Sequence, residues 1–153
     1  MAQKMSTALC NQLLDTNPIK TIFASGFVCL YSGPVPATAD AGIITGTNTA
    51  VKQVVIGAPG PGTGITFNAA AAAGVIAKNS TETWNGTVAN SATITFYRVV
   101  TAADDDTADS GLIYPRIQGT VGAGGADMNL ADPALVAAAP FQMNYFTEAF
   151  TPS

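Results

Sequence analysis

Thr93-Ile-Thr-Phe-Tyr-Arg-Val-Val100 carries the clearest strand signal in this chain of 153 residues. The segment is rich in β-branched and aromatic residues, whose side chains suit a pleated strand. Two similar segments follow it, Tyr114-Pro-Arg-Ile-Gln-Gly-Thr-Val-Gly122 and Ala126-Asp-Met-Asn-Leu130, and stretches rich in glycine and aspartate separate the three. This order of strands and turns is typical of an antiparallel β-sheet.

Short strand-like segments separated by turn residues also occupy the rest of the chain. Residues 20–31 are apolar on both faces, which predicts a strand that is covered on both sides and paired with the C-terminal strands. Asn85-Gly86 predicts a hairpin turn or a bulge. About eight short strands predict an all-β fold, an antiparallel β-sandwich of the jelly-roll type. The other expected strands are residues 51–56, 65–67, 74–78, 92–101, 112–121, 127–130 and 140–151.

The N-terminal segment predicts a short helix over residues 5–14. Apolar residues at every fourth position form a stripe along it, and Ser6 or Thr7 is suited to cap its first turn. A proline follows and ends the helix. We therefore expect an N-terminal helical segment, residues 1–18, followed by one β-sandwich domain, residues 19–153.

The composition limits the classes of function. Charged residues make up 10% of the chain, against about 25% in typical soluble domains. A surface so poor in charge favours association with other subunits over a monomer covered with small polar residues. The net charge is −4 and the six basic residues are scattered, so binding to nucleic acid is not expected. No segment has the pattern of a signal peptide or a membrane span, so neither export by a visible signal nor membrane insertion is expected.

Few residues are candidates for catalysis or metal binding. The chain contains no histidine, which removes the commonest general base and metal ligand. No serine, lysine or carboxylate pair stands out as a catalytic set, so we expect neither enzyme activity nor a cofactor. Asp104, Asp105, Asp106 and Asp109 form the only charge cluster. Their spacing does not match a calcium-binding EF-hand loop, which favours a solvated turn over a cation site.

Five further side chains carry structural expectations. Arg98 shares its face of the strand with apolar residues and should pair with a carboxylate or with backbone carbonyls. Arg116 shares its face with polar residues and is expected to face solvent or a partner chain. Trp84 is expected in the core. Cys10 and Cys29 lie among apolar neighbours and are expected to be buried free thiols.

A series of segments along the chain shows more than a general strand pattern. The segments are Tyr31-Ser-Gly-Pro-Val-Pro-Ala-Thr-Ala-Asp40, Thr83-Trp-Asn-Gly-Thr87, Phe96-Tyr-Arg-Val99, Tyr114-Pro-Arg-Ile-Gln-Gly-Thr-Val-Gly122, Gly125-Ala-Asp-Met-Asn-Leu130 and Phe146-Thr-Glu-Ala-Phe150. Together, over residues 13–151, this series resembles a family of small β-rich virion structural proteins of tailed bacteriophages. The resemblance implies a capsid decoration (cement) protein that lies on the outer surface of the capsid and bridges capsomers. Its partners would be the major capsid protein and further copies of itself in a homo-oligomer such as a trimer, assembled in the cytoplasm of a bacterial host.

Contacts with neighbouring subunits are expected at three places. These are the N-terminal helix, the Pro/Gly-rich loop over residues 58–64, and the last strand. A component of the neck, tail or baseplate, or a module that binds host glycans, remains as an alternative. The expected contact residues are Met5, Leu9, Leu13, Pro59, Pro61, Tyr145 and Phe146.

Overall fold

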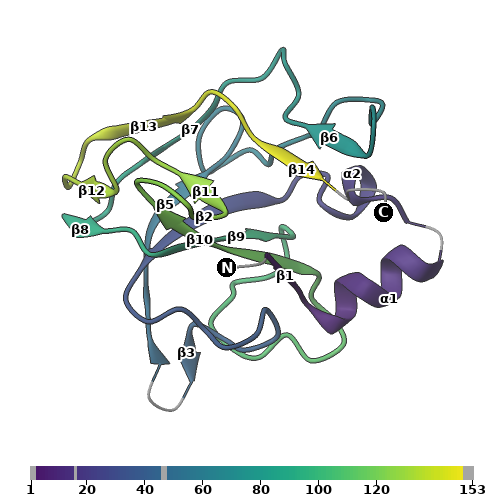
Figure 1. Ribbon diagram of the computed structural model, residues 1–153, viewed down its shortest axis with the longest axis horizontal. Coiled ribbons are helices and arrows are strands. Elements are labelled where there is room, and N and C mark those ends of the chain that lie inside the picture. Colours follow the sequence, from purple (N-terminus) through teal and green to yellow (C-terminus); the bar gives the residue numbers. More distant parts are fainter. Residues whose placement is uncertain (1–2, 16, 46–47, 150–153) are drawn as a thin grey trace.

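The computed structural model describes residues 3–15, 17–45 and 48–149, with a six-stranded sheet at its centre (Figure 1). The strand order is β1-β10-β9-β2-β5, each strand antiparallel to its neighbours, and β11 runs parallel beside β10. The strands of this sheet are β1 (Lys4–Met5), β2 (Phe27–Ser32), β5 (Val51–Ile56), β9 (Phe96–Val100), β10 (Arg116–Gly122) and β11 (Met128–Asn129).

The other strands of the described chain form antiparallel pairs. These results confirm an all-β fold with antiparallel sheets and a short helix. The pairs are separate two-stranded units rather than a second continuous sheet, so the jelly-roll arrangement is not confirmed. The pairs are β3 (Ile44–Thr45) with β4 (Asn48–Thr49), β6 (Val75–Ala77) with β14 (Thr147–Ala149), β7 (Trp84–Thr87) with β13 (Pro140–Met143), and β8 (Ala92–Thr93) with β12 (Ala134–Leu135).

Apolar side chains cover both faces of the central sheet, as expected for β2. Val28 and Leu30 of β2 belong to the larger core, which also contains Trp84. Cys29 and Tyr31 point to the opposite face and belong to a smaller core. Alternation along one strand thus supplies both cores, and the prediction that Trp84 is a core residue is confirmed, since its side chain is fully buried.

The N-terminal helix begins two residues later than the sequence pattern predicts. Helix α1 spans Thr7–Asp15, while Met5 pairs with Ile117 as part of strand β1. Ser6 is the N-cap, as one of the two predicted candidates, because its hydroxyl oxygen accepts a hydrogen bond from the Leu9 amide at 3.2 Å. The first turn is therefore fixed at the edge of the central sheet.

The predicted strand over residues 20–31 is wrong in its first half. Residues Ile19–Ile22 form the short helix α2, whose first residue follows Pro18, and Ser25 then has a positive φ of 63°. A β-carbon at Gly26 would collide with the carbonyl oxygen of Val100, so a glycine lets this turn pack against β9. The strand itself pairs with β9 and β5, not with the C-terminal strands.

Three further boundaries differ from the predictions. Asn85-Gly86 lies inside β7, not at a turn, because a β-carbon at Gly86 would collide with the carbonyl oxygen of Val55 and a glycine is needed for this close approach. Residues 92–101 form two strands, β8 and β9, and residues 140–149 form two more, β13 and β14. Phe150 and Thr151, the expected end of the last strand, lie outside the described residues.

Candidate functional site

Two arginines and two aspartates form a buried charge cluster on the face of the central sheet that carries the smaller core. Arg98 lies on β9 and Arg116 on the neighbouring strand β10. Asp104 and Asp106 lie in the segment that connects these strands. The four side chains are 0–1% exposed. Two positive and two negative charges balance each other, which is the condition under which buried charges are tolerated.

Each arginine binds mainly one aspartate. Arg98 forms an ion pair with Asp106. Arg116 donates to both carboxylate oxygens of Asp104, from Nε at 2.6 Å and from Nη2 at 2.8 Å, a bidentate geometry that makes strong hydrogen bonds. Burial opposes the charged form of Arg116, but the hydrogen bonds and charge of Asp104 outweigh this effect and raise the pKa of the guanidinium.

Neutral groups complete the hydrogen bonding around the cluster. Gln118 Oε1 accepts from Arg98 Nε at 2.9 Å and from Nη2 at 2.7 Å. The carbonyl oxygen of Ala41 accepts from Arg98 Nη2 at 2.6 Å, and the Tyr31 hydroxyl donates to Asp106. Burial is the first cause that raises the pKa of Tyr31 well above its usual value, and the charge of Asp106 adds to it.

This geometry confirms one prediction and corrects two. Arg98 does pair with a carboxylate and with a backbone carbonyl, as expected from its apolar strand face. The acidic segment is not simply a solvated turn, because Asp104 and Asp106 are buried while Asp105 is exposed. Arg116 does not face solvent, because the acidic segment folds back over its strand and covers it.

A third carboxylate ties the same region to helix α1. Asp40 accepts hydrogen bonds from the backbone and hydroxyl groups of Thr7 at 2.9 and 2.8 Å, and from the Ser110 hydroxyl at 2.7 Å. Burial works to raise the pKa of Asp40, but the hydrogen bonds from Ser110 and Thr7 outweigh it and lower the pKa. The cluster and Asp40 thus hold two loops and the helix start in fixed positions.

The charge cluster therefore has a structural role. Its carboxylates bind arginine, tyrosine and backbone groups of the same chain. Within residues 3–15, 17–45 and 48–149, no group of three or more His, Cys, Asp or Glu side chains is arranged to hold a metal ion.

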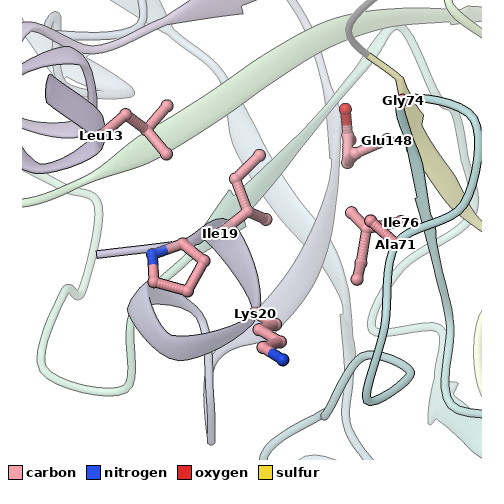
Figure 2. A pocket seen from close by; sticks show the side chains of 8 residues that line it. Leu13, Ile19, Lys20, Ala71, Gly74, Ile76 and Glu148 are labelled. Atoms are coloured by element: carbon pink, nitrogen blue, oxygen red, sulfur yellow. The ribbon is translucent and has the colours of Figure 1, made fainter. Parts of the chain in front are cut away.

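A separate apolar pocket of about 480 Å³ lies between the two helices and the β6–β14 pair (Figure 2). Leu13 of α1 and Ile19 of α2 lie on one side, and Ala71 and Ile76 on the other. Pro18, Lys20, Gly74 and Glu148 complete the lining. Two of the lining residues, Lys20 and Glu148, carry a charged group. In a pocket with mostly apolar walls, a few polar groups determine which ligands are accepted and how they are oriented.

Of these two residues, Glu148 is buried and Lys20 is exposed. The Glu148 side chain is 3% exposed and extends from β14 toward Leu13 and Ile19 in Figure 2. Its Oε2 accepts a hydrogen bond from Gln3 Nε2 at 2.6 Å, whereas its Oε1 is buried without a hydrogen-bond partner in the described structure. Burial is the main cause that raises the pKa of Glu148 to about 7. The negative charge of Asp127 also raises this pKa, while the hydrogen bond from Gln3 lowers it.

The seven predicted contact residues do not form one surface. Leu9 and Phe146 are buried in the larger core, so the prediction that they are exposed is wrong. Leu13 is half-buried and lines the pocket. The exposed residues of the predicted set are Met5, Pro59, Pro61 and Tyr145.

Sequence reasoning missed two features of the structure, an exposed apolar pair and a buried glutamate. Leu112 and Ile113 are adjacent and 70% and 71% exposed, although they were expected inside a strand that in fact begins at Arg116. Glu148 was not singled out, although it has the same strand parity as Phe146. Side chains of the same parity lie on the same face of a strand. Because Phe146 is expected at the surface from the sequence, this parity did not indicate that Glu148 is buried.

The two cysteines differ in environment. Cys29 is buried, as expected, and burial raises the pKa of its thiol to about 11. Cys10 is exposed on helix α1, so the expectation that it is buried is wrong. The helix turns its other side, with Leu9, to the core.

Comparisons with protein-family models, with curated proteins and with solved structures found no match to this chain. None of the helices in the described part of the chain has the length and apolar character needed to cross a bilayer.

Proposed function

We propose that this protein is a structural component of a tailed-phage particle that decorates the capsid and stabilises it by bridging capsomers. Support comes from the resemblance of its segments to small virion proteins and from the low charge of its surface. Of six basic and ten acidic residues, five are buried: Arg98, Arg116, Asp104, Asp106 and Glu148. A surface with so few charges has little to oppose close packing against other subunits.

The exposed apolar side chains supply a place for such packing. Leu112 and Ile113 lie in the segment between β9 and β10, just after Ser110, which is bound to Asp40. The buried charge cluster holds the earlier part of the same segment. An apolar pair on a fixed segment can anchor a partner with little loss of conformational entropy. In this proposal, Leu112 and Ile113 are the main contact with the capsid.

Attachment of many copies to one capsid would make weak contacts of each copy sufficient for stable binding. Copies bound around neighbouring capsomers link them, so that weak individual affinities combine into strong overall binding. A protein that binds only the assembled shell also stabilises that shell by mass action. Neither effect requires a catalytic site.

The alternatives differ in the number of copies that each particle contains. A decoration protein should be present on the order of hundreds of copies, while a neck or tail ring contains about six or twelve. A glycan-binding module would need aromatic side chains on its surface. Trp84 cannot be one of them, because it is fully buried. Quantitative mass spectrometry of purified particles, scaled to the major capsid protein, separates a decoration protein from a ring component.

A paired substitution tests the proposed contact. Replacing Leu112 and Ile113 together by aspartate should reduce incorporation into particles at least tenfold while the protein remains folded, because both side chains are exposed. Replacing the exposed Leu14 by aspartate is the matched control and should leave incorporation unchanged. Normal incorporation of the double variant would exclude this segment as the contact.

A further inference from the structure

The pocket beside Glu148 combines an apolar volume with one unsatisfied acceptor. Its walls come from Leu13, Ile19, Ala71 and Ile76, and Glu148 Oε1 is buried without a hydrogen-bond partner in the described structure. A buried carboxylate oxygen without a donor is costly. Oε1 has almost no exposed surface, so a ligand reaches it only when the carboxyl group turns toward the pocket. A donor placed on Oε1 in that position would remove the cost.

The balance of charge favours a cationic donor. The Glu148 carboxyl group is surrounded by the Gln3 amide, the Tyr97 ring system and the charge of Asp127. None of these groups carries a positive charge. An uncharged donor would satisfy Oε1 but leave the negative charge uncompensated, whereas an ammonium or guanidinium group provides both.

The basic residue of the pocket does not supply this cation. Lys20 lines the pocket, but its side chain is directed away from Glu148 in Figure 2. Its ammonium group donates to the backbone carbonyl of Ala69, which does not line the pocket. Lys20 is exposed, so its charge is screened by solvent. A ligand cation at Glu148 therefore meets only a weak repulsion from it.

The apolar walls of the pocket indicate that the part of the ligand beyond its cationic group is apolar. A volume of about 480 Å³ holds an alkyl chain together with its head group, and small-molecule sites commonly begin at about 300 Å³. We propose that this pocket binds a ligand with an apolar stem and a terminal ammonium or guanidinium group, with the cation on Glu148 and the stem between Ile19 and Ile76.

This chemistry has two sources, a free alkylamine or a lysine or arginine side chain of another protein. n-Hexylamine represents the first source and a blocked tripeptide with a central lysine represents the second. Binding is followed by NMR through the methyl signals of Leu13, Ile19 and Ile76. Binding of hexylamine without binding of the peptide identifies a free amine as the ligand of the pocket. Binding of both identifies a side chain of another protein as that ligand. Binding of neither overturns the proposal.

Two variants that each remove one charge, one inside the pocket lining and one outside it, test the assignment to Glu148. E148Q should weaken hexylamine binding at pH 8 about tenfold or more, because a charge-assisted hydrogen bond is lost. K52Q, which removes a charge on β5 outside the pocket lining, should leave binding unchanged. Equal binding by E148Q and the natural chain would overturn the proposal, as would tighter binding of n-hexanoate than of n-hexylamine.

The pH dependence of the natural chain provides a test that needs no variant. Only ionised Glu148 attracts the cation, so affinity for hexylamine should fall about tenfold from pH 8 to pH 6. n-Hexanol, which has the same stem and no charge, should show no such fall. Equal pH dependence for the amine and the alcohol would contradict the role of Glu148. These tests use the isolated protein, so their outcome is independent of its place on a particle.

Discussion

Replacing Asp106 by asparagine should destabilise the protein strongly, because it leaves the buried cluster with one unbalanced positive charge. The Arg98 and Asp106 side chains are both 0% exposed. After the change, the Arg98 guanidinium retains Gln118 and the Ala41 carbonyl, which are neutral partners. Tyr31 also loses its charged acceptor. Breaking a buried ion pair in this way costs about 3–5 kcal/mol.

Unfolding in urea, followed by the fluorescence of the single tryptophan, measures this loss. Trp84 is fully buried, so its emission should change on unfolding. In a thermal scan the same loss corresponds to a fall in Tm of roughly 6–20 °C for a chain of this size. Asp105→Asn is the matched control, one residue away and exposed, and should leave the transition unchanged.

A double substitution separates the charge argument from a simple change of shape. Arg98→Met together with Asp106→Asn makes the cluster neutral again. Its loss of stability should be smaller than the sum of the two single losses by at least about 1 kcal/mol. The reasoning is refuted if Asp106→Asn matches Asp105→Asn, or if the two single losses simply add.

Three further predictions concern the core, the pocket and the thiols. Leu9→Ala should cost about 2–5 kcal/mol by leaving a cavity, while Leu14→Ala, at an 84% exposed position, should be nearly neutral; equal urea midpoints would show that Leu9 is not a core residue. Because the pKa of Glu148 is raised from 4.5 to about 7, this group favours the folded state below about pH 4.5, and its contribution is lost as the pH rises through 7. The stability of Glu148→Gln relative to the natural chain should therefore rise by up to about 3 kcal/mol between pH 4.5 and 8, and a difference that does not vary with pH would contradict the raised pKa. A maleimide reagent should label Cys10 in the folded protein and Cys29 only after unfolding, and peptide mapping that finds both labelled at once would contradict the burial of Cys29.

The strands that the sequence predicts best are those with uninterrupted apolar or β-branched patterns. Residues 51–56 form a strand with the predicted bounds. The stretch over residues 20–31 is harder to predict, because its apolar pattern continues through helix α2 and through the turn that follows the helix, up to Ser25 and Gly26. What separates the two conformations there is the packing of Gly26 against β9, a contact between residues far apart in the chain that local patterns do not contain.

In the candidate sites, too, some features follow from neighbouring residues in the sequence, whereas others depend on contacts between distant segments. The partner type of Arg98 was predictable from its strand face, but the identity of the partner depends on how the acidic segment folds back. The burial of Arg116 depends on the same segment, so its own strand pattern was misleading. The pocket beside Glu148 is formed by segments from both ends and the middle of the chain, and no single stretch of sequence predicts it.

Immunogold labelling of purified phage particles with an antibody to this protein tests the proposed role most directly. Under the proposed function a phage encodes the chain, and the particles to label are those of that phage, with particles lacking the protein as the control. A capsid decoration protein should give label distributed over the whole head. Label confined to the neck or tail, or absent from intact particles, would contradict the decoration role.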